Sequence, residues 1–176
     1  MNSSKIAVAL AASLFLVNAS AQDKGGPSDP QIAGIVVTAN AIDIDAGKLA
    51  KSHTKNKQVS EFAQLMITDH TAVNKQAGAL AKKLGVKPED SPTSQSLKTG
   101  AAENTKNLKS LKGAAFDKVY VDHEVAYHQQ VLDAIDKVLI PSAKNAELKN
   151  LIVKVRPAIA AHLDHAKMIQ SELAKK

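Results

Sequence analysis

The segment Phe62-Ala-Gln-Leu-Met-Ile-Thr-Asp-His-Thr-Ala-Val73 decides the fold, because its apolar residues repeat with the period of an α-helix. The row includes Met66 and continues to Val59 on one side and to Ala77, Leu80 and Leu84 on the other. A row with this spacing is the core-facing side of an amphipathic helix. His70 falls on the row between Met66 and Val73, so the pattern predicts a titratable ring that faces the core.

Helical patterns cover nearly all of the chain after residue 30, and no segment alternates in the manner of a strand. We expect helices over about 30–53, 58–84, 93–112, 114–140 and 146–173. Gly85, Gly113 and Pro141 stand where three of these patterns break, and Pro157 predicts a kink or a boundary inside the last one. The third pattern is thin and polar, which is typical of a peripheral connecting helix. The other four predict an all-α fold, a four-helix bundle with an extra short connecting helix, in one domain over residues 31–174.

Residues 1–21 have the parts of a secretory signal peptide. Lys5 supplies the positive charge, residues 6–17 form an apolar run too short to span a bilayer, and Ala19-Ser-Ala21 fits the small-residue cleavage pattern. We therefore expect an exported, periplasmic chain, with a polar linker over residues 22–30. The sequence has no cysteine, which excludes disulfides, thiolate metal sites and a lipid anchor on cysteine.

The amino-acid composition limits the kinds of binding partner that the sequence indicates. The 23 basic and 17 acidic residues give a net charge of +6, which favours at most a peripheral association with anionic surfaces of the cell envelope. Aromatic residues are 3% and no dense basic run occurs, so nucleic-acid binding is not indicated. No further apolar run is long enough for a transmembrane segment. The sequence contains no motif of hydrolytic or phosphoryl-transfer enzymes. It does not reveal which protein partner the chain has.

Three histidines fall on the apolar rows of three different predicted helices: His70, His128 and His162. Each lies within about two residues of the middle of its helix, or about 3 Å at a rise of 1.5 Å per residue. Helices aligned in a bundle share their mid-height whatever their direction. We therefore expect the three imidazoles to meet in one layer of the core.

Carboxylates lie near the same layer. Asp43 stands at the middle of the first predicted helix, next to its apolar row, and is the expected fourth ligand. Glu124 and His165 each lie one turn from a layer histidine and are weaker candidates. Three imidazoles and a carboxylate suit one zinc, copper or iron ion. A ferritin-type di-iron centre is not favoured, because no histidine here has a glutamate three residues before it.

Two other interpretations remain open. The histidines can form a hydrogen-bonded polar layer without metal in a structural or interaction bundle of the envelope. A catalytic metal with an open position is the third and weakest interpretation, so no residue is assigned as catalytic. Rings that converge on one point would favour metal, and rings that turn apart to separate partners would favour the structural layer.

Several segments resemble one family. They are residues 43–50, 59–70, 113–120, 128–132 and 162–163, and they include Phe-Ala-x-x-Met-x-x-Asp-His and Gly-Ala-Ala-Phe-Asp. Over roughly residues 31–172 the chain resembles bacterial exported proteins of unknown function that are labelled "predicted outer membrane protein". The resemblance implies a ferritin-like helical bundle with histidines at the positions of His70, His128 and His162. The family has glutamate where this chain has Asp43. Metal handling or envelope stress protection would suit such a protein.

Overall fold

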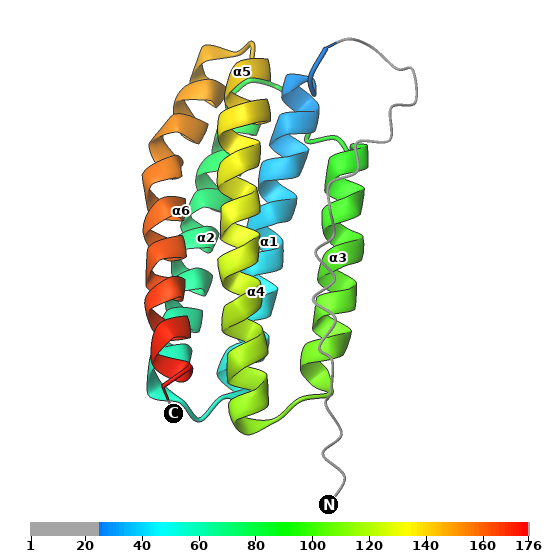
Figure 1. Cartoon of the computed structure of the whole chain (residues 1–176). Helices are drawn as coiled ribbons and strands as arrows, with labels where there is room; N and C mark the ends of the chain where they lie inside the picture. The colour runs from blue at the N-terminus through cyan, green and yellow to red at the C-terminus, as the bar shows by residue number, and fades with distance from the viewer. Residues whose placement is uncertain (1–24, 176) are drawn as a thin grey trace, which may run out of the picture.

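The structure is a computed structural model that describes residues 25–175, and this part of the chain is helical without a strand. Its elements are α1 (Asp29–His53), α2 (Lys57–Lys83), α3 (Pro92–Lys109), α4 (Gly113–Ala134), the π-helical η1 (Ile135–Leu139), α5 (Ile140–Ser142) and α6 (Ala146–Leu173). Figure 1 shows the long helices side by side in an elongated bundle. No helix among the described residues is long and apolar enough to cross a membrane. The predicted signal peptide, residues 1–21, lies outside the described residues.

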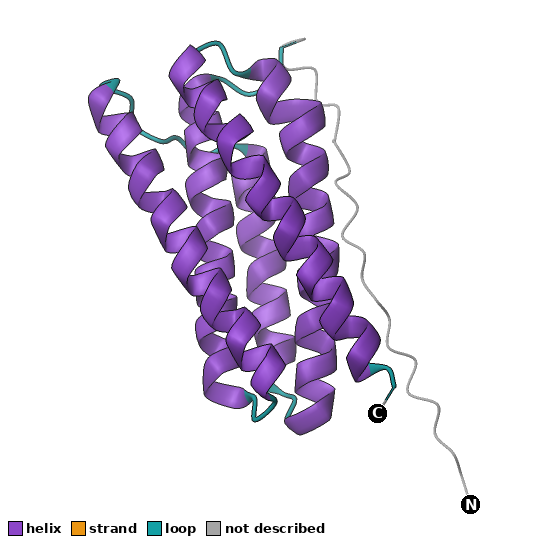
Figure 2. Ribbon diagram, turned by 90° about the vertical axis from the view of Figure 1, so that its left-hand side faces the viewer, coloured by secondary structure: helices purple, strands orange, loops and turns teal. Residues whose placement is uncertain are grey.

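The long helices form a closed ring around the core. α1 packs chiefly on α2 and α4 chiefly on α6, while contacts of α2 with α6 and of α1 with α4 complete the ring. α3 packs outside the ring, against α1 and α4, as Figure 1 shows. Figure 2 shows the long helices of the bundle from a second direction. The thin apolar edge of the predicted third helix thus corresponds to a peripheral helix, although at 18 residues it is longer than a short connector.

Two apolar clusters fill the core at different levels. One cluster centres on Phe62, Met66, Phe116 and Tyr120, and the other on Ile35, Leu132 and Ile152. On each helix of the ring, the buried polar residues lie between or beside the segments that build these clusters. A polar layer is therefore enclosed by apolar side chains toward both ends of the bundle.

Capping residues set where the helices start, and so set the height of every side chain. Ser28 and Gln31 form a capping box at α1, and the Asn145 side chain accepts from two backbone N–H groups at the start of α6. The Asn56 side chain caps α2 in the same way. All five predicted helix starts lie within one residue of the observed ones.

The sequence predicts that Pro141 ends a helix and that Pro157 kinks the last helix or marks a boundary in it. The helical path instead passes through Pro141 and ends at Ser142, and the segment Ile135–Leu139, which ends two residues before Pro141, widens into a π-helix. Proline has no N–H to donate and its ring crowds the preceding turn, which explains the wider turn. α6 runs without a boundary through Pro157.

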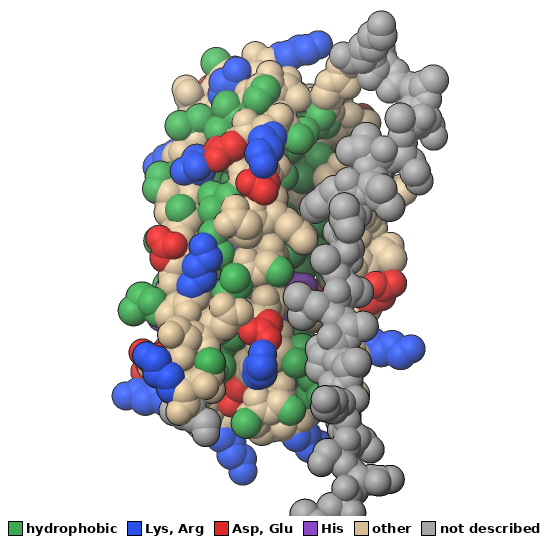
Figure 3. Space-filling model, viewed as in Figure 1, with side chains coloured by type: hydrophobic (Ala, Val, Ile, Leu, Met, Phe, Trp, Pro, Cys, Tyr) green, Lys and Arg blue, Asp and Glu red, His purple; other side chains and the backbone are tan. Residues whose placement is uncertain are grey.

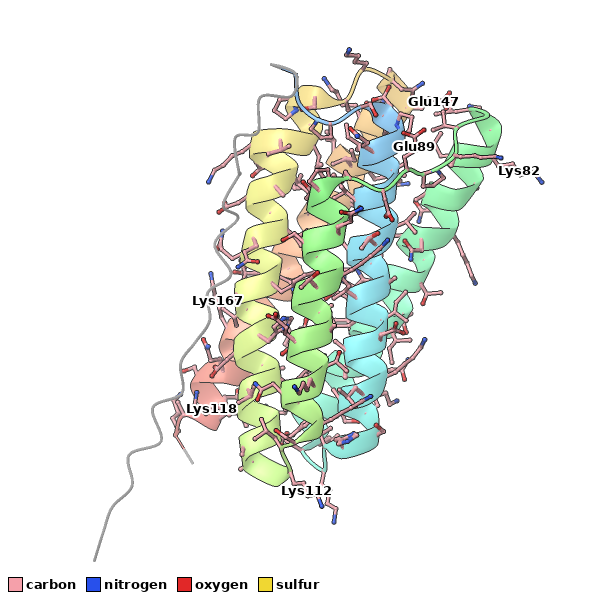
Figure 4. The ribbon with its side chains drawn as sticks, turned by 90° about the vertical axis from the view of Figure 1, so that its right-hand side faces the viewer. Lys82, Glu89, Lys112, Lys118, Glu147 and Lys167 are labelled. Carbon is pink, nitrogen blue, oxygen red and sulfur yellow. The ribbon has the colours of Figure 1, made fainter. Side chains whose placement is uncertain are left out.

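The connection from α2 to α3 lies directly on the start of α1. The Glu89 N–H donates to the Pro30 carbonyl at 2.9 Å. A Cβ atom at Gly34 would stand 2.0 Å from the Glu89 carbonyl oxygen, so this approach requires glycine. Figure 4 shows Glu89 beside the first turns of α1.

Charged side chains are distributed over the outside. On the face in Figure 3, basic and acidic side chains are interspersed. Lys82 and Lys112 extend away from the bundle in Figure 4. This pattern fits a solvated exterior and leaves the buried polar layer as the unusual feature of the molecule.

Candidate metal centre

The rings of His70, His128 and His162 lie together in the core, and each residue is at most 4% exposed. Their ring centroids are 5.8 Å apart for His70 and His128, 5.2 Å for His70 and His162, and 5.5 Å for His128 and His162. One nitrogen of each ring lies within 4.8 Å of one nitrogen of the other two. The layer expected from the helix midpoints is therefore present.

These spacings are close to those of imidazoles on one ion. With Zn–N near about 2.0 Å, and about 1.1 Å from nitrogen to ring centre, two rings on a tetrahedral ion have centres about 5.1 Å apart. The observed separations of 5.2 to 5.8 Å are slightly wider. The ring planes are inclined by 50° to 85°, so the rings are not stacked on one another. The three rings would have to move inward to reach ligand distance of one ion.

Asn40 fixes the orientation of the His70 ring. Its side-chain N–H₂ donates to the Val36 carbonyl at 2.8 Å, so its oxygen faces the ring. That oxygen lies 2.7 Å from His70 Nδ1. An amide oxygen only accepts, so the proton of the neutral ring is on Nδ1 and the lone pair is on Nε2.

The other two rings are held in a similar way. His128 Nδ1 donates to the backbone carbonyl of Glu124 at 3.0 Å, which leaves its Nε2 as the lone-pair nitrogen. His162 Nε2 donates to the Asp69 carboxylate at 2.9 Å, which leaves its Nδ1. Metal-binding histidines generally donate their second nitrogen to a carboxylate or a carbonyl, as these do.

The remaining nitrogen of each ring is buried and has no hydrogen-bond partner within residues 25–175. Burial, and to a lesser degree the neighbouring histidines, lower the pKa of His70 to about 3 and that of His128 to about 4. Neutral imidazole is the form that binds a metal. The rings of His70 and His128 are therefore uncharged, and each of the three rings keeps one buried nitrogen that no described residue binds.

Asp43 and Glu124 add a pair of carboxyl groups. Asp43 Oδ2 lies 3.6 Å from His70 Nε2, and Glu124 Oε2 lies 3.4 Å from His128 Nδ1. One ligand atom from each of Asp43, Glu124 and His128 falls within 4.8 Å of the other two. Both carboxyl groups are buried, at 3% and 1% exposure. Nitrogen and oxygen ligands thus occur in two groups that share His128.

The two carboxyl groups hold at least one proton between them. Burial raises the pKa of Glu124 to about 8, although a hydrogen bond from Asp43 moderates that rise. Burial, and next the charge of Glu124, raise the pKa of Asp43 well above its usual range. Two adjacent buried carboxylates without a cation repel each other and are poorly solvated. A divalent ion at this place would take over the role of the proton.

Of the weaker predicted ligands, the structure brings only Glu124 into these groups. His165 is half-buried, and its ring packs edge-on against Phe62 with a centroid separation of 5.2 Å. It is not among the described residues that cluster around the layer. The six histidines therefore divide into three in the layer and three elsewhere, His53, His123 and His165.

Sequence reasoning gave no role to the residues that hold the rings. Asn40 is a polar residue buried to 6% exposure on α1, and Asp69 directly precedes His70 while it supports His162 on another helix. Tyr120, which does not hold a ring, has a fully buried hydroxyl without a partner among the described residues. An asparagine close to an apolar row was the one available signal.

Comparison with known proteins gives a family and no function. Residues 16–169 match a family described as a domain of unknown function, DUF4142. No curated protein matches the chain. No solved structure matches it either.

Proposed function

Because the chain belongs to DUF4142, a family of unknown function, we propose its function from the buried layer: it binds one transition-metal ion. His70, His128 and His162 supply three nitrogens, and Asp43, whose Oδ2 lies 3.6 Å from His70 Nε2, supplies a carboxylate oxygen. Glu124 supplies a second carboxylate or orients His128. Zinc, copper and iron suit nitrogen-rich sets of this kind better than calcium or magnesium.

One observation carries the proposal. Each ring uses one nitrogen in a hydrogen bond that fixes its tautomer, and the other nitrogen is buried without a partner among the described residues. A layer of histidines built only for structure would turn both nitrogens toward partners, because an unpaired buried acceptor costs about 1–3 kcal/mol. Three such nitrogens would cost about 3–9 kcal/mol, as much as the whole stability of many domains.

We also propose a fold type and a cellular compartment for the protein. We place the protein among ferritin-like four-helix bundles, since four long helices surround one buried polar layer. The signal-peptide pattern in residues 1–21 supports a periplasmic location, with peripheral envelope association as the extension of that idea. Because the proposed ligands are buried in the core, we propose metal storage, buffering or stress protection as the role of the site.

The direct test measures metal content and thermal stability of the purified protein before and after chelation. We expect near-stoichiometric zinc, copper or iron, and loss of it in His70→Ala and in His162→Ala. At free metal a hundred times Kd, binding adds about 2.7 kcal/mol. For a chain of this size that corresponds to about 5–10 °C in melting temperature.

His165→Ala is the matched control, because it removes an imidazole from the same helix one turn from His162 but outside the layer. It should keep the metal and the metal-induced rise in melting temperature. If wild type retains no ion and no added ion raises its melting temperature, the metal proposal fails. The alternative of a structural or interaction bundle would then stand.

A further inference from the structure

An apolar space adjoins the histidine layer in the core of the bundle, and residues of α1, α2, α3, α4 and α6 line it. Its volume is about 60 Å³, and its walls include Ile35, Val131 and Ile152 from three different helices. His70 and Asp43 also line it. The space therefore extends from the apolar cluster near Ile35 to two of the proposed metal ligands.

The dimensions favour a small, slender occupant. Ile35 and Asp43 both line the space and are eight residues apart on α1, which is about 12 Å at 1.5 Å per residue. One water needs about 10–15 Å³ measured in this way. A volume of about 60 Å³ spread over that length suits a molecule of two to four heavy atoms better than a ring or an acyl chain.

The chemistry of the walls favours an uncharged occupant over water. Two of the polar wall residues are already engaged: Asn40 bonds His70 and the Val36 carbonyl, and the Tyr127 hydroxyl donates to the Ala39 carbonyl at 3.2 Å. His70 Nε2 and Asp43 Oδ1, which have no partner among the described residues, belong to the groups proposed to hold the metal. Apolar residues form most of the remaining wall. Water needs two to four polar partners, and apolar cavities otherwise stay dry and take up small apolar molecules.

The space also has a route to the outside. Thr93 on α3 and Gln130 on α4 line it and are both partly exposed. The π-helical segment η1 supplies Ile135 and Leu139 to the same wall. Short π-helical segments of this kind frequently occur at functional sites.

We propose that this cavity binds a small uncharged molecule of two to four heavy atoms next to the metal, where the molecule can occupy an open coordination position. The inference rests on the proposed metal binding and goes beyond it, because it assigns the centre an exogenous ligand and a route for that ligand. A purely storage-type site needs neither.

Two probes test the proposal separately. Xenon, followed by methyl NMR of Ile35 and Ile152, tests the cavity in metal-free and in metal-loaded protein. Nitric oxide added anaerobically to Fe(II)-loaded protein, followed by EPR, tests whether a ligand in the cavity reaches the metal. Ala39→Leu, which adds volume at a wall residue, should weaken both xenon and nitric oxide binding at least tenfold.

Ala102→Leu is the matched control, because Ala102 is exposed on α3 and does not line the cavity. It should leave both affinities unchanged. Val131→Ile fills the cavity by a single methylene and replaces Ala39→Leu if that variant does not fold. A metal assay on every sample separates this inference from the proposed function.

Each outcome decides between the alternatives. Saturable xenon shifts, together with nitric oxide binding that cavity filling weakens, support the proposal. Two results with metal-replete protein overturn the proposal and leave metal binding intact. One is the absence of saturable xenon shifts, and the other is nitric oxide binding that does not change when the cavity is filled by substitution. Protein that binds xenon but holds no metal overturns the ligand at the metal together with the proposed function.

Discussion

The carboxyl pair makes a prediction about the metal-free protein: its stability should fall as pH rises from 6.5 to 8. Burial raises the pKa of Glu124 from 4.5 to about 8 in the folded protein. A carboxyl group whose folded pKa is raised contributes its full stability below the unfolded pKa and loses it as pH rises through the folded one. Asp43, whose pKa burial also raises, acts in the same direction.

The magnitude follows from the same values. Each pH unit at which the unfolded chain has lost the proton and the folded chain keeps it costs about 1.36 kcal/mol. Between pH 6.5 and 8 the Glu124 proton accounts for about 1.6 kcal/mol, allowing for half-titration at the upper end. At about 2–4 °C per kcal/mol, the melting temperature should drop by about 3–6 °C.

The histidines change the stability with pH in the opposite direction, so their contribution has to be separated from that of the carboxyl pair. The pKa of His70 is lowered to about 3 and that of His128 to about 4, so the unfolded chain binds more protons than the folded one below about 6.5. Their effect is a loss of stability as pH falls. Glu124→Gln keeps these histidines and replaces the protonated carboxyl group with a neutral group of similar shape.

The assay is therefore chemical denaturation of chelated wild type and Glu124→Gln at intervals from pH 5 to 8.5. Between pH 6.5 and 8, wild type should lose about 1.6 kcal/mol more free energy of unfolding than Glu124→Gln. A difference that stays constant over this range refutes the shared-proton argument. With metal present the trend should reverse, since metal competes with the proton and its stabilising effect grows with pH.

Three further substitutions test the surroundings of the layer. Asn40→Ala leaves the buried His70 Nδ1–H unpaired, so it should cost about 1–3 kcal/mol in denaturation and weaken metal binding about 10–100-fold in chelator competition. Asp69→Asn should weaken metal binding by less than about tenfold with little change in stability, because the Asp69 side chain is 40% exposed and an amide oxygen can still accept from His162. Gly34→Ala should cost about 1–3 kcal/mol in the same denaturation assay, because its Cβ meets the Glu89 carbonyl, but should leave metal affinity unchanged.

The helical fold and the histidine layer were accessible from the sequence for one physical reason. The apolar rows identify the inner face of each helix, and caps such as Ser28 and Asn145 fix where each helix starts. Inner face and height together locate a side chain such as His70 in a bundle. The signal peptide remains a prediction from the pattern of residues 1–21.

The difference between Glu124 and His165 could not be read from spacing. Four residues along a helix correspond to a rotation of about 40° from the starting direction, and three residues to about 60° the other way. α4 is packed on by α6, α1 and α3, so it is buried over a wide arc that includes Glu124. α6 contacts chiefly α4 and α2, and at His165 the ring reaches Phe62 instead of the layer.

The positions of Asn40 and Asp69 depend on contacts between helices. Asn40 meets His70 across α1 and α2, and Asp69 meets His162 across α2 and α6. These pairings depend on the rotation of each helix about its axis, which the packing of all its neighbours sets to within a few degrees. A single-helix pattern contains no such information.

Charge balance connects the carboxyl pair, the metal and the cavity. Three neutral imidazoles and two ionised carboxylates carry a charge of −2, which a divalent ion cancels and a single proton only halves. Burying a net charge is costly, so the layer should prefer a dication over Cu(I), which would leave one carboxyl group to be protonated. A neutral centre also places no net charge against the apolar cavity lined by His70 and Asp43. The same balance that selects a divalent metal therefore favours an uncharged ligand beside it, since an anion would restore the charge that the metal removes.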